Sequence, residues 1–176
     1  LHDALPILLD YKSYDKDISY FYKKLLELLN SLNTVNNDKK DFKKIISDSV
    51  AINKELMDKI REAQIERYGL QREKIVSYST TPSRAILVVG SNIRELENVL
   101  EKVSDTDIDV YTHDDMILAH TFPAFEKYKN LKGQYGQGIE NCLLDFSTFP
   151  GPIVLTAHSL YNVENLYRGR LYTTDM

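Results

Sequence analysis

An uninterrupted run of five apolar residues, residues 85–89, constrains the fold of this chain more than any other feature. Three of the five are β-branched, and the run stops at Gly90. Such a run is typical of a strand that is buried on both faces of a sheet. The apolar residues that follow recur at helical spacing, at Ile93, Leu96, Leu100 and Val103. We therefore expect a buried parallel strand that leads into an amphipathic helix.

The same strand pattern recurs at residues 108–112 and 153–156. Strands that alternate with helices predict an α/β fold, here a Rossmann-like parallel sheet domain with right-handed crossovers. In open parallel sheets, ligands bind beyond the carboxyl ends of the strands. The candidate site residues are therefore those that directly follow each strand, namely residues 90–92, 113–115 and 157–159.

The N-terminal half has a helical pattern. Apolar residues recur every three or four positions from Asp17 to Asn33, at Ile18, Phe21, Leu25, Leu28 and Leu32. A longer helix is expected from Asp41 to a stop at Gly69, with one apolar face made of Phe42, Ile45, Ile46, Leu56, Ile60 and Ala63. Each helix has one apolar stripe, so both must pack against other elements. We expect part of a helical bundle domain before the sheet domain.

These patterns divide the chain into four segments. Residues 1–9 are expected to be an artefactual or disordered leader, because they look like translated sequencing-adapter sequence. Residues 10–69 are expected to be the end of an N-terminal helical domain, and residues 70–83 a polar linker. Residues 84–176 are expected to form the Rossmann-like α/β domain, incomplete at its C-terminus.

Composition excludes several classes of function. The net charge of -4 gives no reason to expect nucleic acid as a partner. No run approaches the roughly 20 apolar residues that span a bilayer, so we expect a cytoplasmic protein without a membrane partner. The single cysteine, Cys142, precludes an internal disulfide and any cysteine-based metal site completed by this chain alone. The glycine-rich stretch at residues 132–138 lacks the Lys-Ser/Thr of a P-loop and the dinucleotide-binding spacing, which argues against a nucleotide site.

Four motifs carry a family resemblance. They are Ile-Asp-Val-Tyr-Thr-His-Asp-Asp-Met at residues 108–116, Pro-Ala-Phe-Glu-Lys-Tyr at 123–128, Gly-Gln-Tyr-Gly at 133–136 and Phe-Pro-Gly-Pro-Ile at 149–153. Together with residues 168–174, they resemble the hybrid-cluster protein family, also called hydroxylamine reductases. The resemblance implies an anaerobe-type iron-sulfur oxidoreductase whose hybrid iron-sulfur-oxygen cluster reduces hydroxylamine or nitric oxide. It also implies a second iron-sulfur cluster and an electron-donor protein as partner.

The resemblance further implies three ligand positions of the hybrid cluster within this chain. The family has histidine, glutamate and cysteine where this chain has Ser91, Asp115 and Ser159. Asp115 keeps a carboxylate, but the loss of a thiolate and an imidazole should weaken cluster binding severely. His158 is a possible substitute ligand beside Ser159. The resemblance leaves the identity of the catalytic residues open.

The remaining candidates have structural interpretations. We expect His113 to hold its loop through a hydrogen bond, with direct metal ligation as the alternative. His120 is expected to be solvated or to cap a helix, and Cys142 to be a buried, inert thiol. Asp114 and Asp115 form a candidate catalytic carboxylate pair, and the alternative is a solvated Asp114 with Asp115 alone facing the cleft.

Two functions stay open at this point. The first is a redox enzyme of the hybrid-cluster type with an altered cluster or with ligands from elsewhere. The second is a cluster-free relative that keeps the scaffold for binding or interaction. A distant relationship to carbon monoxide dehydrogenase explains the motifs at residues 111–113 and 149–152 less well.

Overall fold

The computed structural model describes residues 4–34, 39–157 and 161–174, and it divides into two compact units, residues 1–67 and 68–176. Within the described residues, no helix combines the length and the apolar character that crossing a bilayer requires.

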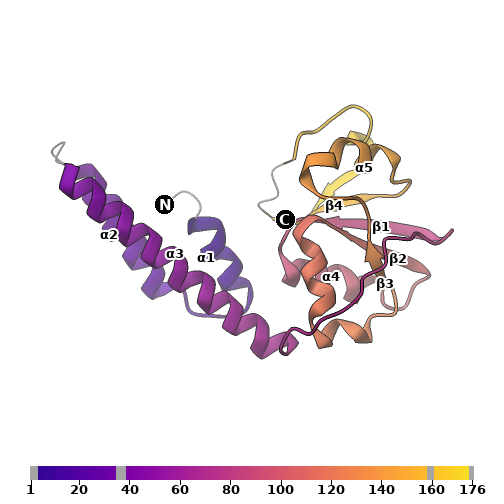
Figure 1. Ribbon diagram of the computed structural model, residues 1–176, viewed down its shortest axis with the longest axis horizontal. Helices are drawn as coiled ribbons and strands as arrows, with labels where there is room; N and C mark the ends of the chain where they lie inside the picture. The colour runs from indigo at the N-terminus through magenta and orange to yellow at the C-terminus, as the bar shows by residue number, and fades with distance from the viewer. Residues whose placement is uncertain (1–3, 35–38, 158–160, 175–176) are drawn as a thin grey trace. The chain divides into compact units, whose positions relative to one another are not determined.

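The first unit consists of three helices, α1 (Ala4–Ser13), α2 (Ser19–Thr34) and α3 (Lys39–Tyr68). Figure 1 shows α2 and α3 lying side by side. The start of α2 is fixed by Asp17, whose carboxylate accepts a hydrogen bond from the backbone N–H of Ser19 at 2.9 Å. Helix α1 includes Ala4 and the rest of residues 4–9, which belong to the segment expected to be a leader.

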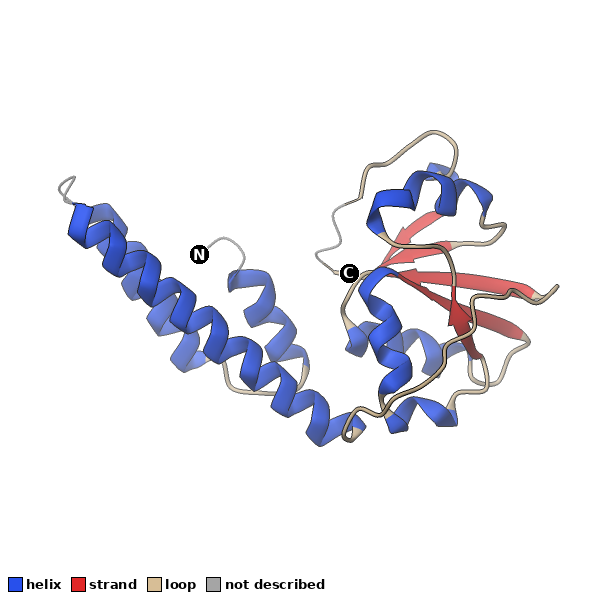
Figure 2. Ribbon diagram, viewed as in Figure 1, coloured by secondary structure: helices blue, strands red, loops and turns tan. Residues whose placement is uncertain are grey.

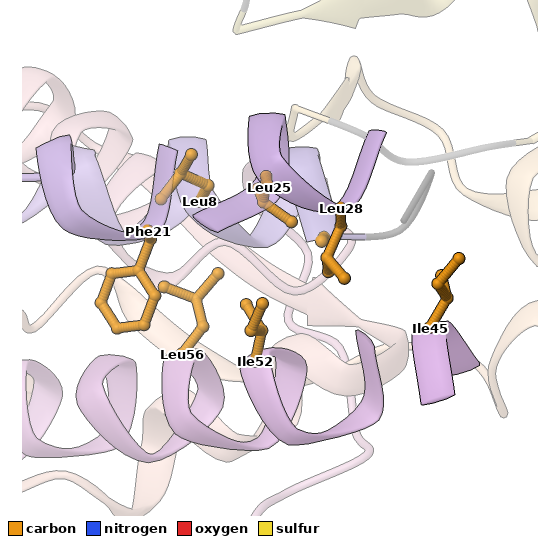
Figure 3. Close-up of a cluster of buried hydrophobic side chains, with 8 residues drawn as sticks. Leu8, Phe21, Leu25, Leu28, Ile45, Ile52 and Leu56 are labelled. Carbon is orange, nitrogen blue, oxygen red and sulfur yellow. The ribbon is translucent and has the colours of Figure 1, made fainter. Parts of the chain in front are cut away.

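Side chains from all three helices form the core of this unit, as Figure 3 shows. The buried residues labelled there are Leu8, Phe21, Leu25, Leu28, Ile45, Ile52 and Leu56. The predicted apolar face of α3 was wrong at Phe42 and Ile46, which are 42% and 63% exposed. Ile46 lies about 100° around the helix from Ile45, so the buried stripe continues through Ile52 instead.

Helix α3 ends where the sequence indicates. Its last residue is Tyr68, and Gly69 follows with a φ of +87°. Glycine adopts this left-handed conformation without the steric penalty of a Cβ atom, so the predicted stop is confirmed.

The second unit contains one five-stranded parallel sheet, drawn in red in Figure 2. Its strands are β1 (Arg84–Val89), β2 (Ile108–His113), β3 (Leu131–Gln134), β4 (Ile153–Leu155) and β5 (Leu171–Thr173). The spatial order is β3-β2-β1-β4-β5, and every pairing is parallel. The three predicted strands are confirmed as the centre of the sheet, whereas the two edge strands were not predicted.

The carboxyl ends of the three central strands lie at the same level. In the register of the sheet, Val89 of β1 lies opposite both His113 of β2 and Leu155 of β4. The strand order also reverses between β1 and β4, since β2 and β3 extend to one side of β1 and β4 to the other. Such a switch point is where open α/β sheets bind ligands.

Short helices connect the strands. They are α4 (Ile93–Val103), η1 (Asp114–Thr121), η2 (Pro123–Lys127), η3 (Ile139–Asn141), α5 (Cys142–Thr148) and η4 (Arg168–Arg170). Phe146 of α5 packs in one core cluster with Leu87, Val89 and Tyr111, which share one face of the sheet. Right-handed crossovers place α4, with its buried Leu100, on the opposite face.

The segment of residues 70–83 reaches the edge strand β3 at Ser77 and the neighbouring strand β2 at Thr81, whose hydroxyl donates to Asp109 Oδ2 at 2.7 Å. The carbonyl oxygen of Ser77 accepts a hydrogen bond from the backbone N–H of Gln134 at 2.9 Å. A Cβ atom on Gly133 would lie 2.2 Å from the same oxygen, so only glycine permits this approach. The segment expected to be a linker thus covers the backbone of an edge strand.

Candidate functional site at the carboxyl edge of the sheet

The loop after β1 begins with a sharp turn and leads into α4. Gly90 has a φ of +123°, a conformation that favours glycine. Ser91 is exposed, whereas Asn92 is buried and caps α4 by accepting a hydrogen bond from the N–H of Glu95 at 3.1 Å. The first predicted ligand position therefore lies on the surface beside a rigid helix start.

The loop after β2 uses Asp114 to hold neighbouring segments in place. Asp114 adopts a φ of +61°, which is uncommon for a residue with a Cβ atom. Its carboxylate accepts a hydrogen bond from the hydroxyl of Tyr161 at 2.6 Å, and its carbonyl accepts one from Gln134 Nε2 at 3.2 Å. Burial and the Asp114 carboxylate raise the pKa of Tyr161 well above its usual range. The prediction of a solvated Asp114 was wrong, because this side chain ties down another loop, while Asp115 is exposed.

His113 is fully buried at the end of β2. Its Nε2 lies 3.0 Å from Asp145 Oδ2, which also accepts the backbone N–H of Gln137 at 3.0 Å. A Cβ atom on Gly136 would lie 2.2 Å from the same carboxylate, so the loop packs directly against Asp145. The predicted hydrogen-bonding role of His113 is confirmed. Its Nδ1 has no hydrogen-bond partner among the described residues.

His120 is buried, and the expectation of a solvated or capping residue was wrong. Only 6% of its surface is exposed, and its Nε2 lies 2.9 Å from the hydroxyl of Thr112. Thr112 also donates to Gln134 Oε1 at 2.5 Å, so this hydroxyl links the side chains of His120 and Gln134. Burial, helped by the positive charge of Lys74, lowers the pKa of His120 to about 4. The imidazole is therefore neutral at pH 7.

Cys142 begins α5 and is half-buried against the core cluster of the sheet. Its contacts are those of a small apolar side chain.

The residues that the structure describes do not fit an iron-sulfur cluster. Ser91 and Asp115 offer a hydroxyl and a carboxylate, which are hard oxygen donors, whereas such clusters are held mainly by thiolates. Among the described side chains, no group of three or more histidine, cysteine, aspartate or glutamate residues is placed to hold a metal ion. Two further predicted positions, His158 and Ser159, lie outside the described residues.

Sequence reasoning missed Glu95, whose carboxylate has partners in several loops of this edge. A signal was present, because an asparagine followed three residues later by a glutamate resembles a capping box. It also missed Asp145, for which the sequence around residue 145 gives no local signal.

Comparison with known proteins agrees with the fold. The Prismane/CO dehydrogenase family matches residues 9–176. A hydroxylamine reductase of Acidiphilium cryptum is 34% identical over 81% of this chain and 26% of its own length. Those of Chlorobaculum tepidum and Escherichia coli are 32% and 31% identical, over 93% of this chain and 30% and 29% of their own lengths. The chain thus spans less than a third of these curated relatives. With its parallel sheet and its match over nearly the whole sequence, the chain belongs to the Prismane/CO dehydrogenase family.

Proposed function

We propose that this chain is part of an iron-sulfur oxidoreductase of the hydroxylamine reductase type, and that the carboxyl ends of its strands form one side of the active site. The observation that carries the proposal is the shared level at which β1, β2 and β4 end, beside Ser91 and Asp115. The relatives named hydroxylamine reductase support the same activity. The substrate would be hydroxylamine or nitric oxide, with electrons from a donor protein in the cytoplasm.

Within this proposal, Ser91, Asp115 and Ser159 occupy the ligand positions of the family, and His158 is the possible substitute. Asp115 is exposed and so is accessible to a small substrate or a metal ion. The described donors do not fit the family's cluster, so we assign no chemical step through it. Their direct contribution is polar: a hydroxyl and a carboxylate at one edge of the sheet accept hydrogen bonds from a small N–H or O–H donor.

The second candidate is a cluster-free family member that uses the same scaffold for binding. The observation that favours it is the shortage of suitable ligands among the described residues. Oxygen donors at two family positions would leave the fold intact while removing the affinity for a cluster.

Iron content separates the two candidates. This chain would replace the matched segment of the E. coli hydroxylamine reductase, so that the rest of the relative supplies the remaining parts. Iron and acid-labile sulfide per chain would be measured after purification without oxygen, for the chimera and for its S91H/D115E/S159C variant. A triple variant at exposed positions of α4, which leads away from this edge, N98Q/E101Q/K102Q, is the matched control.

Several irons per unaltered chimera, with a paramagnetic signal that hydroxylamine changes, would support the oxidoreductase. Iron only in S91H/D115E/S159C would support a scaffold that has lost its cluster. No iron in either, with both well folded, would overturn the assignment of these positions.

A further inference from the structure

Glu95 lies in the first turn of α4 and forms a reciprocal pair with the capping residue Asn92. The backbone N–H of Glu95 donates to Asn92 Oδ1, and Asn92 Nδ2 donates to Glu95 Oε1, both at 3.1 Å. The pair fixes the Glu95 carboxylate directly beside the loop that carries Ser91.

The second oxygen of the same carboxylate reaches two other loops. Glu95 Oε2 accepts a hydrogen bond from the backbone N–H of Ala157 at 2.8 Å and another from the hydroxyl of Thr174. Ala157 follows β4 and Thr174 follows β5, at 62 and 79 residues from Glu95 in the sequence. One carboxylate therefore joins the loops after three strands.

A helix cap alone does not require these contacts. The local partner of Glu95 is Asn92, and α4 is capped by that pair without help from distant loops. Hydrogen bonds to a charged acceptor are also stronger than neutral ones, so this arrangement favours one fixed spacing of the loops. The neighbouring Thr156 adds to it, since its N–H and hydroxyl both donate to the carbonyl of Val89, at 2.9 and 3.1 Å.

We propose that Glu95 is a positioning residue for the site at the switch point. It holds the loop after β1 against the loop after β4, and so sets the spacing at which the carboxyl edge presents its polar groups. The importance of Glu95 for catalysis rests on the proposed function, whereas the hydrogen bonds by which Glu95 joins the loops do not depend on it. Glu95 itself contacts no reacting atom in this role.

An isosteric substitution tests this idea. Glu95→Gln preserves the shape but replaces one acceptor oxygen by a donor, so the new amide cannot satisfy the Ala157 N–H, the Thr174 hydroxyl and Asn92 Nδ2 together. Adding Asn92→Asp restores the match, because the new carboxylate at position 92 accepts from the new amide and still caps α4. Glu101→Gln makes the same charge change at an exposed position of α4 and is the control.

The measurement is amide hydrogen exchange by NMR on the unligated 176-residue chain. In E95Q, the Ala157 amide should exchange roughly tenfold faster relative to the Leu100 amide in the core of α4, as expected for a lost charged hydrogen bond. N92D/E95Q should restore the protection, and E101Q should leave it unchanged. A purely structural loss would accelerate both amides equally, and that result would overturn the proposal.

An unchanged Ala157 amide in E95Q, or a double variant without rescue, would overturn it as well. The test needs no cluster and no activity. An absence of iron in the chimera would therefore count against the proposed function and leave this inference to be decided by exchange alone.

Discussion

Replacing Gly151 by alanine should strongly destabilise the sheet unit. Gly151 lies in the turn between α5 and β4, and a Cβ atom there would lie 2.1 Å from the carbonyl oxygen of Ala85 in β1. The next residue, Pro152, accepts a hydrogen bond from the N–H of Leu87 at 3.0 Å, so the turn is held against β1 and cannot simply retreat. Relieving the overlap requires a shift of about 1 Å in a backbone paired with the centre of the sheet.

The overlap should lower the free energy of unfolding by about 3 kcal/mol, the upper end of the cost of overpacking. Alanine also reduces the conformational entropy of the unfolded chain, which offsets about 0.4–1 kcal/mol of this loss. For a unit of this size the net loss corresponds to a melting temperature lower by roughly 10 °C. Gly169→Ala is the matched control, because no atom of the described residues lies within 4 Å of a Cβ built there. Calorimetry should find that control unchanged or slightly more stable. Equal melting temperatures for the two variants would refute the argument from close approach.

Three further predictions follow from buried contacts. Arg170→Met should lower the free energy of unfolding by about 2–3 kcal/mol, because the guanidinium donates to the carbonyls of four residues at the end of α5 and in the following turn. Urea titrations should show little change for the control Arg168→Met, at an exposed position. His120, with its pKa lowered to about 4, should show no NMR titration between pH 5 and 8. Because His120 binds a proton more readily in the unfolded state, its contribution to the free energy of unfolding should be complete above pH 6.5 and should decrease as the pH falls towards 4. An NMR titration of His120 with a midpoint near pH 6.5 would contradict the burial of its ring. Leu100→Ala should cost about 2–5 kcal/mol by chemical denaturation, whereas Leu143→Ala, at a side chain 51% exposed, should cost far less.

Local patterns were enough to predict the central strands, α4 and the end of α3. A continuous apolar run specifies burial on both faces, and helical spacing specifies a single buried stripe, without reference to distant residues. The same reasoning failed for β3 and β5, which are four and three residues long. β4 is equally short but is a continuous apolar run, Ile-Val-Leu, whereas β3 and β5 read Leu-Lys-Gly-Gln and Leu-Tyr-Thr and contain no such run, so their identity depends on the neighbour with which they pair.

The candidate site divides in the same way. The sequence alone determined that polar residues such as Ser91 and Asp115 follow buried parallel strands, because a strand's end is a local event. Only the tertiary structure decided that Asp114 holds Tyr161, that His120 is buried against Thr112, and that Glu95 joins loops 62 and 79 residues away. A hydrogen bond between distant segments depends on where the folded sheet places them, and the spacing of apolar residues within one segment carries no information about that placement.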